Sequence, residues 1–284
     1  MKIQVCQMVK GLLATLALLC AAIEAPAQTF SDRITIENQC SFAVWVKALD
    51  NAGSPPLRPE DNLVRLDQGQ SHVYGIPDGG WGGQFRPKFD CDENGNNCRS
   101  GQSLPPCPTD PPPYNICEPP AETKVEFFFP FPDTPIQKPF FDISLVDGYT
   151  LHTKITPSAP SSGNCTTFDC NLSFDVCPSD EKFGLGDLRV VRDGETVMCL
   201  SPCKRWNYPS PYGLNKPEIE GDGRELCCAG GISPAECNAG IVTQTEYVKR
   251  VRANCPSAYS FAFDDDAGTH ACPFDTNFTV TFCP

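Results

Sequence analysis

Apolar and polar residues alternate near both ends of the chain, in the pattern typical of a strand with one buried face. Arg33–Asn38 and Phe42–Lys47 follow this pattern near the start, and Asn277–Phe282 follows it at the end. Three internal segments are also strand-like, namely Ser71–Ile76, Val125–Phe129 and Phe141–Val146. A chain that begins and ends in strands, with irregular sequence between them, predicts a β-sandwich that carries inserted subdomains.

The intervening segments have few periodic runs. Gly79–Gly83 (GGWGG) predicts a flexible or tightly turned segment, and Asp90–Pro120 is rich in proline and cysteine. Cys165–Cys255 is also rich in cysteine and predicts a loop-rich region held by disulfides. Within it, Thr245–Asn254 is the best helix candidate, because its apolar residues share one face and a proline follows shortly after.

The first residues have the features of a secretory leader. Lys2 and Lys10 precede the apolar run Gly11–Ala22, and Ala25 and Ala27 place small residues before a cleavage site. We therefore expect residues 1–27 to be a signal peptide, because the apolar run is too short to cross a bilayer. The mature protein should be secreted and extracellular.

Composition supports this location and excludes several classes of function. The chain has 284 residues, 18 cysteines, 29 prolines and a net charge of −13. Such an acidic chain lacks the electrostatic surface that binds nucleic acid or an anionic membrane. Removal of the leader leaves sixteen cysteines, an even number that fits complete pairing in an oxidising compartment. Three glycosylation sequons remain, at Asn164, Asn171 and Asn277.

Metal and cofactor chemistry find little support. His72, His152 and His270 are far apart and lack the spacing of metal ligands. Asp90–Gly95 resembles the start of a calcium loop, but Gly101 stands where the bidentate glutamate is needed, and an Asn-Gly turn explains the segment better. We expect neither a metal nor a cofactor.

Five segments give the chain its resemblance to a known family, the thaumatin-like proteins (the osmotin or pathogenesis-related group five family). They are Phe141–Gly148 (FDISLVDG), Leu226–Gly230 (LCCAG), Thr245–Tyr247 (TEY), Cys255–Phe261 (CPSAYSF) and Val280–Pro284 (VTFCP). The resemblance covers essentially all of residues 29–284, and the sixteen cysteines follow the family's order. It departs at Cys98–Ser103 (CRSGQS), where a family cysteine is serine, and in a long segment between Cys203 and Cys227.

The resemblance implies a mainly β protein of three parts, most simply a monomer. Residues 28–88, 127–170 and 256–284 would form a thaumatin-like β-sandwich core. Residues 89–126 would form a small disulfide-clipped loop domain, and residues 171–255 a disulfide-rich domain with a short helix. The family order also implies eight disulfides: Cys40–Cys283, Cys91–Cys98, Cys107–Cys117, Cys165–Cys272, Cys170–Cys255, Cys177–Cys199, Cys203–Cys227 and Cys228–Cys237.

In the family, a cleft between the sandwich and the disulfide-rich domain is lined by carboxylates and one arginine. Carried over, the carboxylates are Glu126, Asp142, Asp147 and Asp264, and Arg86 is the nearest candidate for the arginine. The sequence itself puts Glu126 on the strand face opposite its aromatic neighbours. Burial there would raise its pKa, although a solvated surface charge is the simpler interpretation. Asp142 and Asp147 converge only if the strand ends or bulges between them.

These residues allow three functional hypotheses. The first is a secreted defence or wall-associated protein that binds β-1,3-glucan in the cleft and has an antifungal role, as the resemblance implies. The second is a weak endo-β-1,3-glucanase with Glu126 as the acid and Asp147 as its ionised partner. The third is an inhibitor or binding partner of a secreted hydrolase. Three aromatic side chains of the long segment could stack on sugar rings or pack locally: Trp206, Tyr208 and Tyr212.

Overall fold

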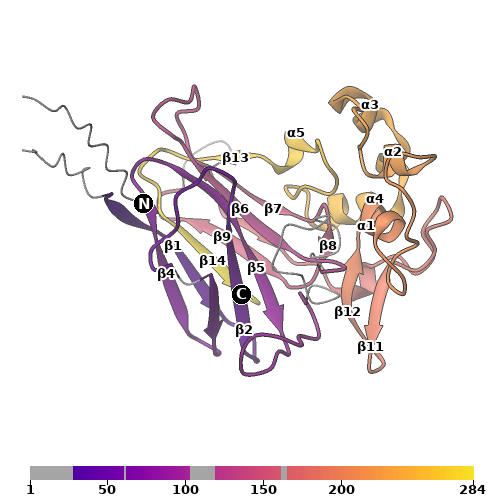
Figure 1. The fold of residues 1–284 in the computed structure, drawn as a ribbon, viewed down its shortest axis with the longest axis horizontal. Helices are drawn as coiled ribbons and strands as arrows, with labels where there is room; N and C mark the ends of the chain where they lie inside the picture. Colours follow the sequence, from indigo (N-terminus) through magenta and orange to yellow (C-terminus); the bar gives the residue numbers. More distant parts are fainter. Residues whose placement is uncertain (1–27, 61, 103–118, 161–164) are drawn as a thin grey trace, which may run out of the picture.

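The computed structural model describes residues 28–60, 62–102, 119–160 and 165–284. Two large sheets lie on one side of the molecule, and a small sheet with short helices lies on the other (Figure 1). The expected leader, Asn164 and the expected Cys107–Cys117 pair are outside the described residues.

The first large sheet has five strands and joins the first and last described strands of the chain. Its last strand, β14, lies between β9 and β1 and runs parallel to β1, whereas its other pairings are antiparallel. In spatial order the strands are β10 (Phe168–Cys170), β9 (Thr153–Pro157), β14 (Phe278–Phe282), β1 (Phe30–Asn38) and β4 (Ser71–Pro77).

The second large sheet has six strands, all paired in the antiparallel sense. In spatial order they are β13 (His270–Ala271), β7 (Phe140–Ser144), β6 (Lys124–Phe129), β5 (Trp81–Phe89), β2 (Val44–Asp50) and β3 (Leu63–Leu66). Residues 124–126 therefore belong to the same strand, β6, as Phe127.

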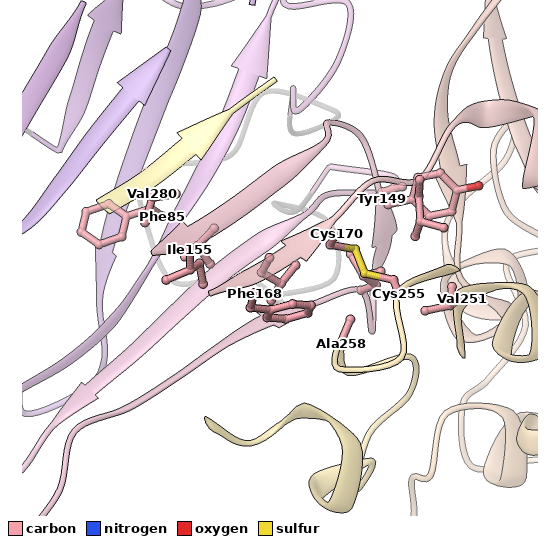
Figure 2. Packing of buried hydrophobic residues seen from close by; sticks show 14 of the residues in the cluster. Phe85, Tyr149, Ile155, Phe168, Cys170, Val251, Cys255, Ala258 and Val280 are labelled. Atoms are coloured by element: carbon pink, nitrogen blue, oxygen red, sulfur yellow. A yellow bond between two sulfur atoms is a disulfide. The ribbon is translucent and has the colours of Figure 1, made fainter. Parts of the chain in front are cut away.

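The inner faces of these sheets form one aromatic core. Phe278 of the five-stranded sheet packs against two rings of the six-stranded sheet, with centroids 5.2 Å from Phe127 and 5.0 Å from Phe141. Phe85 and Val280 also belong to this buried cluster (Figure 2). The alternating pattern of the sequence therefore has a direct cause, because every second residue of these strands is removed from water.

The smaller part of the molecule contains a three-stranded sheet and most of the helices. The sheet consists of β11 (Arg189–Arg192), β12 (Glu195–Leu200) and β8 (Gly148–Tyr149). The helices are α1 (Pro202–Asn207), α2 (Gly223–Leu226), α3 (Pro234–Ala239), α4 (Glu246–Asn254), α5 (Asp265–Gly268) and the 3₁₀ turns η2 (Phe174–Val176) and η3 (Ile241–Gln244). The disulfide between Cys170 and Cys255 joins the end of β10 to the end of α4 (Figure 2).

Seven disulfides are present among the described residues, and each joins a pair that the family resemblance implies. They are Cys40–Cys283, Cys91–Cys98, Cys165–Cys272, Cys170–Cys255, Cys177–Cys199, Cys203–Cys227 and Cys228–Cys237. The adjacent Cys227 and Cys228 tie α2 to α1 and to α3, so one point of the chain holds three helices together.

The six predicted strands and the predicted helix are all present, with bounds within a few residues of the prediction. The prediction for Gly79–Gly83 is wrong in its second half, because Trp81–Gly83 open strand β5. Glycine is needed at position 83 of this strand because there is no room for a side chain: a Cβ would lie 2.3 Å from a ring carbon of Trp81. Among the described residues, none of the helices is long and apolar enough to cross a membrane.

Candidate functional site

The outer face of the six-stranded sheet carries a row of polar side chains. On β6, Val125 and Phe127 are buried in the core, so Lys124 and Glu126 point to the other face. Glu126 lies directly opposite Asp142 of β7 in the strand register, and opposite Gln84 of β5 on its other side. The sheet therefore brings two carboxylates, Glu126 and Asp142, side by side.

Burial acts strongly on this carboxylate pair. It raises the pKa of Glu126, although Lys124 and Arg86 oppose the change. It raises the pKa of Asp142 well above the usual range, and the neighbouring charge of Glu126 adds to the effect. The Oδ1 atom of Asp142 is buried and has no hydrogen-bond partner among the described residues. Glu126 and Asp142 therefore tend to keep a proton between them.

Asp147 reaches the same site from a turn. Strand β7 ends at Ser144, and the turn that follows is closed by a hydrogen bond from the Gly148 amide to the carbonyl of Leu145. The carboxylate forms ion pairs with Lys124 of β6 and with Lys204 of α1, whose Nζ lies 3.5 Å away. Burial alone would raise the pKa of Asp147, but the two lysines outweigh it and hold the pKa below the usual range.

Two further charges complete the site. Arg86 of β5 pairs with the almost fully buried Glu122 at 2.7 Å, and Lys124 lies 3.7 Å from the same carboxylate. The site thus combines four carboxylates, those of Glu122, Glu126, Asp142 and Asp147, with the cations Arg86, Lys124 and Lys204. We call these seven residues the charged cluster. Because the positive charges nearly balance the negative ones, the cluster is much less acidic than four carboxylates alone would make it.

Asp264 has a different environment from the other three predicted carboxylates. It is 3% exposed and accepts hydrogen bonds from the backbone amide and hydroxyl of Ser260. It also pairs with Arg252 of α4 at 2.7 Å. These contacts therefore join the loop that contains Ser260 and Asp264 to α4. None of the described contacts of Asp264 joins it to the charged cluster.

Two other sequence interpretations are now decided by contacts. Trp206 and Tyr208 are buried, and the Trp206 indole donates a hydrogen bond to the Pro217 carbonyl, so these rings pack locally instead of presenting a face for sugars. Tyr212 is half-buried beside Arg192. The segment that resembles a calcium loop is a turn in which Asp92 accepts three hydrogen bonds, from the amides of Asn94 and Asn96 and from the Asn97 side chain.

Three members of the charged cluster were not predicted: Glu122, Lys124 and Lys204. Lys124 stands two residues before Glu126, so the alternation of the strand was a signal that could have placed it on the same face. Lys204 lies in the cysteine-rich part, where no periodic pattern indicates its neighbours. Of the sequons, Asn171 and Asn277 are exposed.

The chain folds as a disulfide-bonded β-sandwich, and its charged cluster lies between the outer face of the six-stranded sheet and the helical region. These features define its structural class. The sequence profile of the thaumatin family matches residues 38–284, so the chain belongs to the thaumatin family.

Several curated relatives are similar over most of their length. Thaumatin-like protein 1 of Arabidopsis thaliana is 32% identical, covering 88% of this chain and 85% of its own. A protein of Prunus avium named glucan endo-1,3-beta-glucosidase is 30% identical, covering 88% and 90% of the two chains. Among solved structures, the thaumatin-like xylanase inhibitor TLXI is matched over 89% of this chain and 99% of its own, with a TM-score of 0.35 and 11% identity.

Proposed function

We propose that this protein is a secreted, wall-associated defence protein that binds β-1,3-glucan at the charged cluster and acts against fungi. The observation that carries the proposal is the cross-strand pair of Glu126 and Asp142 on the outer face of the sheet, flanked by ionised Asp147. Carboxyl groups in two protonation states can both accept and donate hydrogen bonds to sugar hydroxyls. The seven disulfides support secretion, because such bonds persist in oxidising compartments.

Retention on insoluble β-1,3-glucan tests this proposal. Glu126→Gln and Asp142→Asn keep the shape of each side chain but remove its ability to ionise. We expect each variant to bind about tenfold more weakly, the cost of about one charge-assisted hydrogen bond. Asp133→Asn, on an exposed loop, is the control and should bind like the wild type. Wild-type retention by both cluster variants would refute binding at this site.

A weak endo-β-1,3-glucanase is the second candidate function, and one specific observation favours it. Glycoside hydrolysis needs one protonated and one ionised carboxyl group. The cluster supplies both, because the pKa of Asp142 is raised and that of Asp147 is lowered. Glu126 remains the proposed acid, with Asp142 as the neighbour that shares its proton. Because two lysines engage Asp147, we expect only slow turnover, best at mildly acidic pH.

Reducing ends released from a soluble β-1,3-glucan measure this activity. Glu126→Gln should abolish release if Glu126 is the acid, whereas robust turnover in Glu126→Gln would exclude that assignment. Absence of turnover in the wild type, with retention on glucan intact, would leave binding as the function. If the protein neither binds nor cleaves glucan but slows an added secreted hydrolase, the inhibitor hypothesis replaces both.

A further inference from the structure

Two phenylalanines lie beside the carboxylate pair on the outer face of the six-stranded sheet. Lys124, Glu126 and Phe128 are the outward positions of β6, and Phe128 lies directly opposite Phe140 of β7 in the strand register. We call Phe128 and Phe140 the aromatic pair. Glu126 and Asp142 form the next outward pair along the same two strands. The aromatic pair and the carboxylate pair are therefore adjacent layers of one face, about 7 Å apart along the strands.

The hydrophobic core does not explain the aromatic pair. Both rings are half-buried. Among the described residues, neither ring belongs to the core or to the partly buried side chains that pack against it. Aromatic side chains with a few polar groups beside them are typical of surfaces that bind ligands. The position of these two rings is therefore better explained by a ligand than by folding.

The ring of Phe128 is supported on one side and has no side chain opposite it on another. Phe131, in the turn after β6, packs against it with ring centroids 5.8 Å apart. On the β5 side its register partner is Gly82, which has no side chain to cover the ring. A Cβ on Gly82 would lie 3.2 Å from the ring of Phe128 and 3.1 Å from the amide nitrogen of Asn51, so this exposed amide lies beside the ring. A ring held by its neighbours loses little conformational entropy when a ligand packs on it.

The groups on this face fit a neutral sugar chain. The charged cluster is nearly balanced in charge, so its carboxyl groups can serve mainly as hydrogen-bonding partners. A glucose unit of a β-linked glucan has C–H groups on the faces of its ring and hydroxyl groups around its edge. One unit can therefore pack on an aromatic ring while its hydroxyl groups reach the carboxylate pair and the amide of Asn51.

We propose that Phe128 and Phe140 bind the sugar rings of the glucan, with the apolar ring faces on the aromatic pair and the hydroxyl edges toward the carboxylate pair. This inference rests on the proposed function, and it adds the residues that recognise the faces of the sugar rings. Opposite side chains of neighbouring antiparallel strands are about 5 Å apart. A glucan chain that crosses β6 and β7 therefore meets the two aromatic rings one after the other.

Calorimetry with a soluble β-1,3-linked glucose hexamer tests this inference. Phe128→Leu and Phe140→Leu keep an apolar side chain but remove the aromatic ring, and each should weaken binding about fivefold. Phe128→Tyr keeps the ring and should bind within about twofold of the wild type. Phe274→Leu is the matched control, because Phe274 is an exposed phenylalanine that packs on Arg33 of the five-stranded sheet, and it should bind normally. Melting temperatures of all variants check that they are folded.

Nuclear magnetic resonance separates direct contact from an indirect structural effect. Ring currents of the aromatic pair should shift C–H protons of the bound hexamer upfield. The shift should persist with Phe128→Tyr and become smaller with Phe128→Leu at equal saturation. An equal shift with Phe128→Leu would show that the sugar does not pack on this ring, and would refute the proposal for Phe128.

The carboxylate variant Glu126→Gln separates this inference from the proposed function. If Glu126→Gln binds weakly and both leucine variants bind normally, the aromatic pair is refuted and the glucan site in the charged cluster stands. If the leucine variants bind weakly and Glu126→Gln binds normally, the aromatic pair is supported and the role of the carboxylates is refuted. If the wild type does not bind the hexamer, both are refuted.

Discussion

Asp142 and Asp147 are five residues apart and experience opposite electrostatic environments. Asp142 faces a second carboxylate on a buried surface, whereas Asp147 is enclosed by two lysines. Burial disfavours the charged form of both, so the sign of the neighbouring charge decides which of them is ionised near neutral pH. Two substitutions that each remove one carboxylate should therefore change stability in opposite directions.

Asp142→Asn should stabilise the protein at neutral pH. Because the folded pKa of Asp142 is raised, its contribution to stability is fully present below the unfolded pKa and is lost as pH rises through the folded pKa. The asparagine removes that loss, so we expect a gain on the order of 1 kcal/mol at pH 7 that vanishes below about pH 4. Calorimetric melting at both pH values measures it, with Asp133→Asn as the control. A gain that persists at low pH would contradict this explanation.

Asp147→Asn should destabilise the protein at neutral pH. Its lowered folded pKa gives stability that is present above the unfolded pKa and is lost as pH falls through the folded pKa. The substitution leaves Lys124 and Lys204 without this partner, at a cost of about 3 kcal/mol. Melting temperatures should converge with the wild type as pH falls below about 4. Equal melting temperatures at pH 7 would show that the lysines do not depend on Asp147.

At the residue scale, the sequence placed Glu126 on the outer face of its strand but favoured a solvated surface charge, whereas burial raises its pKa. Phe127 and Phe129 lie on the opposite face of the strand, in the core, so they do not cover it. The burial of Glu126 comes from the outer side, where Asp142 and Lys124 are its neighbours. Asp147 is also largely covered, with a side chain only 14% exposed. Alternation gives the face of a strand, but it does not show what covers that face.

At the scale of elements, β8 depends on one glycine. Gly148 has a φ of +111° and pairs with Leu200 of β12, and a Cβ there would lie 2.1 Å from the Cys199 carbonyl oxygen. We expect Gly148→Ala to separate β8 from β12 and to cost more than about 3 kcal/mol, because backbone and not a flexible side chain must move.

Gly194→Ala is the matched control for this prediction. Gly194, in the turn between β11 and β12, also has a positive φ, of +83°, but a Cβ there meets nothing within 4 Å. Its cost should be only about 1 kcal/mol, that of the backbone conformation alone. Secreted yield and melting temperature of the two variants measure the difference. Similar losses in both would show that the close contact at Gly148 is unimportant.

The elements that could be predicted from the sequence differ from the others in how their side chains are buried. Strands β1, β2, β6 and β7 alternate between buried and more exposed residues, so their pattern is visible in the sequence. Strand β5 is buried along nearly its whole length and contains two glycines and Pro87, so it shows neither alternation nor strand propensity. The short helices α1, α2 and α3 are held by disulfides, which leaves their sequences little need for a periodic apolar face.

At the scale of the whole molecule, the bridge between Cys40 and Cys283 encloses almost all of the described residues. The two cysteines are 243 residues apart, whereas Cys91 and Cys98 are 7 apart. In the chain-entropy description, loops of these lengths correspond to about 5 and about 2.5 kcal/mol. Replacing both cysteines of each pair by serine and measuring unfolding in guanidinium should show the larger loss for the long loop. Equal losses would indicate that the pairing of β1 with β14 already restrains the ends.

The position of β14 also has a consequence for the order in which the molecule is made. This strand follows every other strand of the sheet in chain order, yet it lies inside the five-stranded sheet, between β1 and β9. Until β14 has emerged from the ribosome, β1 and β9 each lack a neighbour, and the ring of Phe278 is missing from the core. The sandwich can therefore close only after β14 has been made, so the nascent chain must keep two strand edges from pairing wrongly until then.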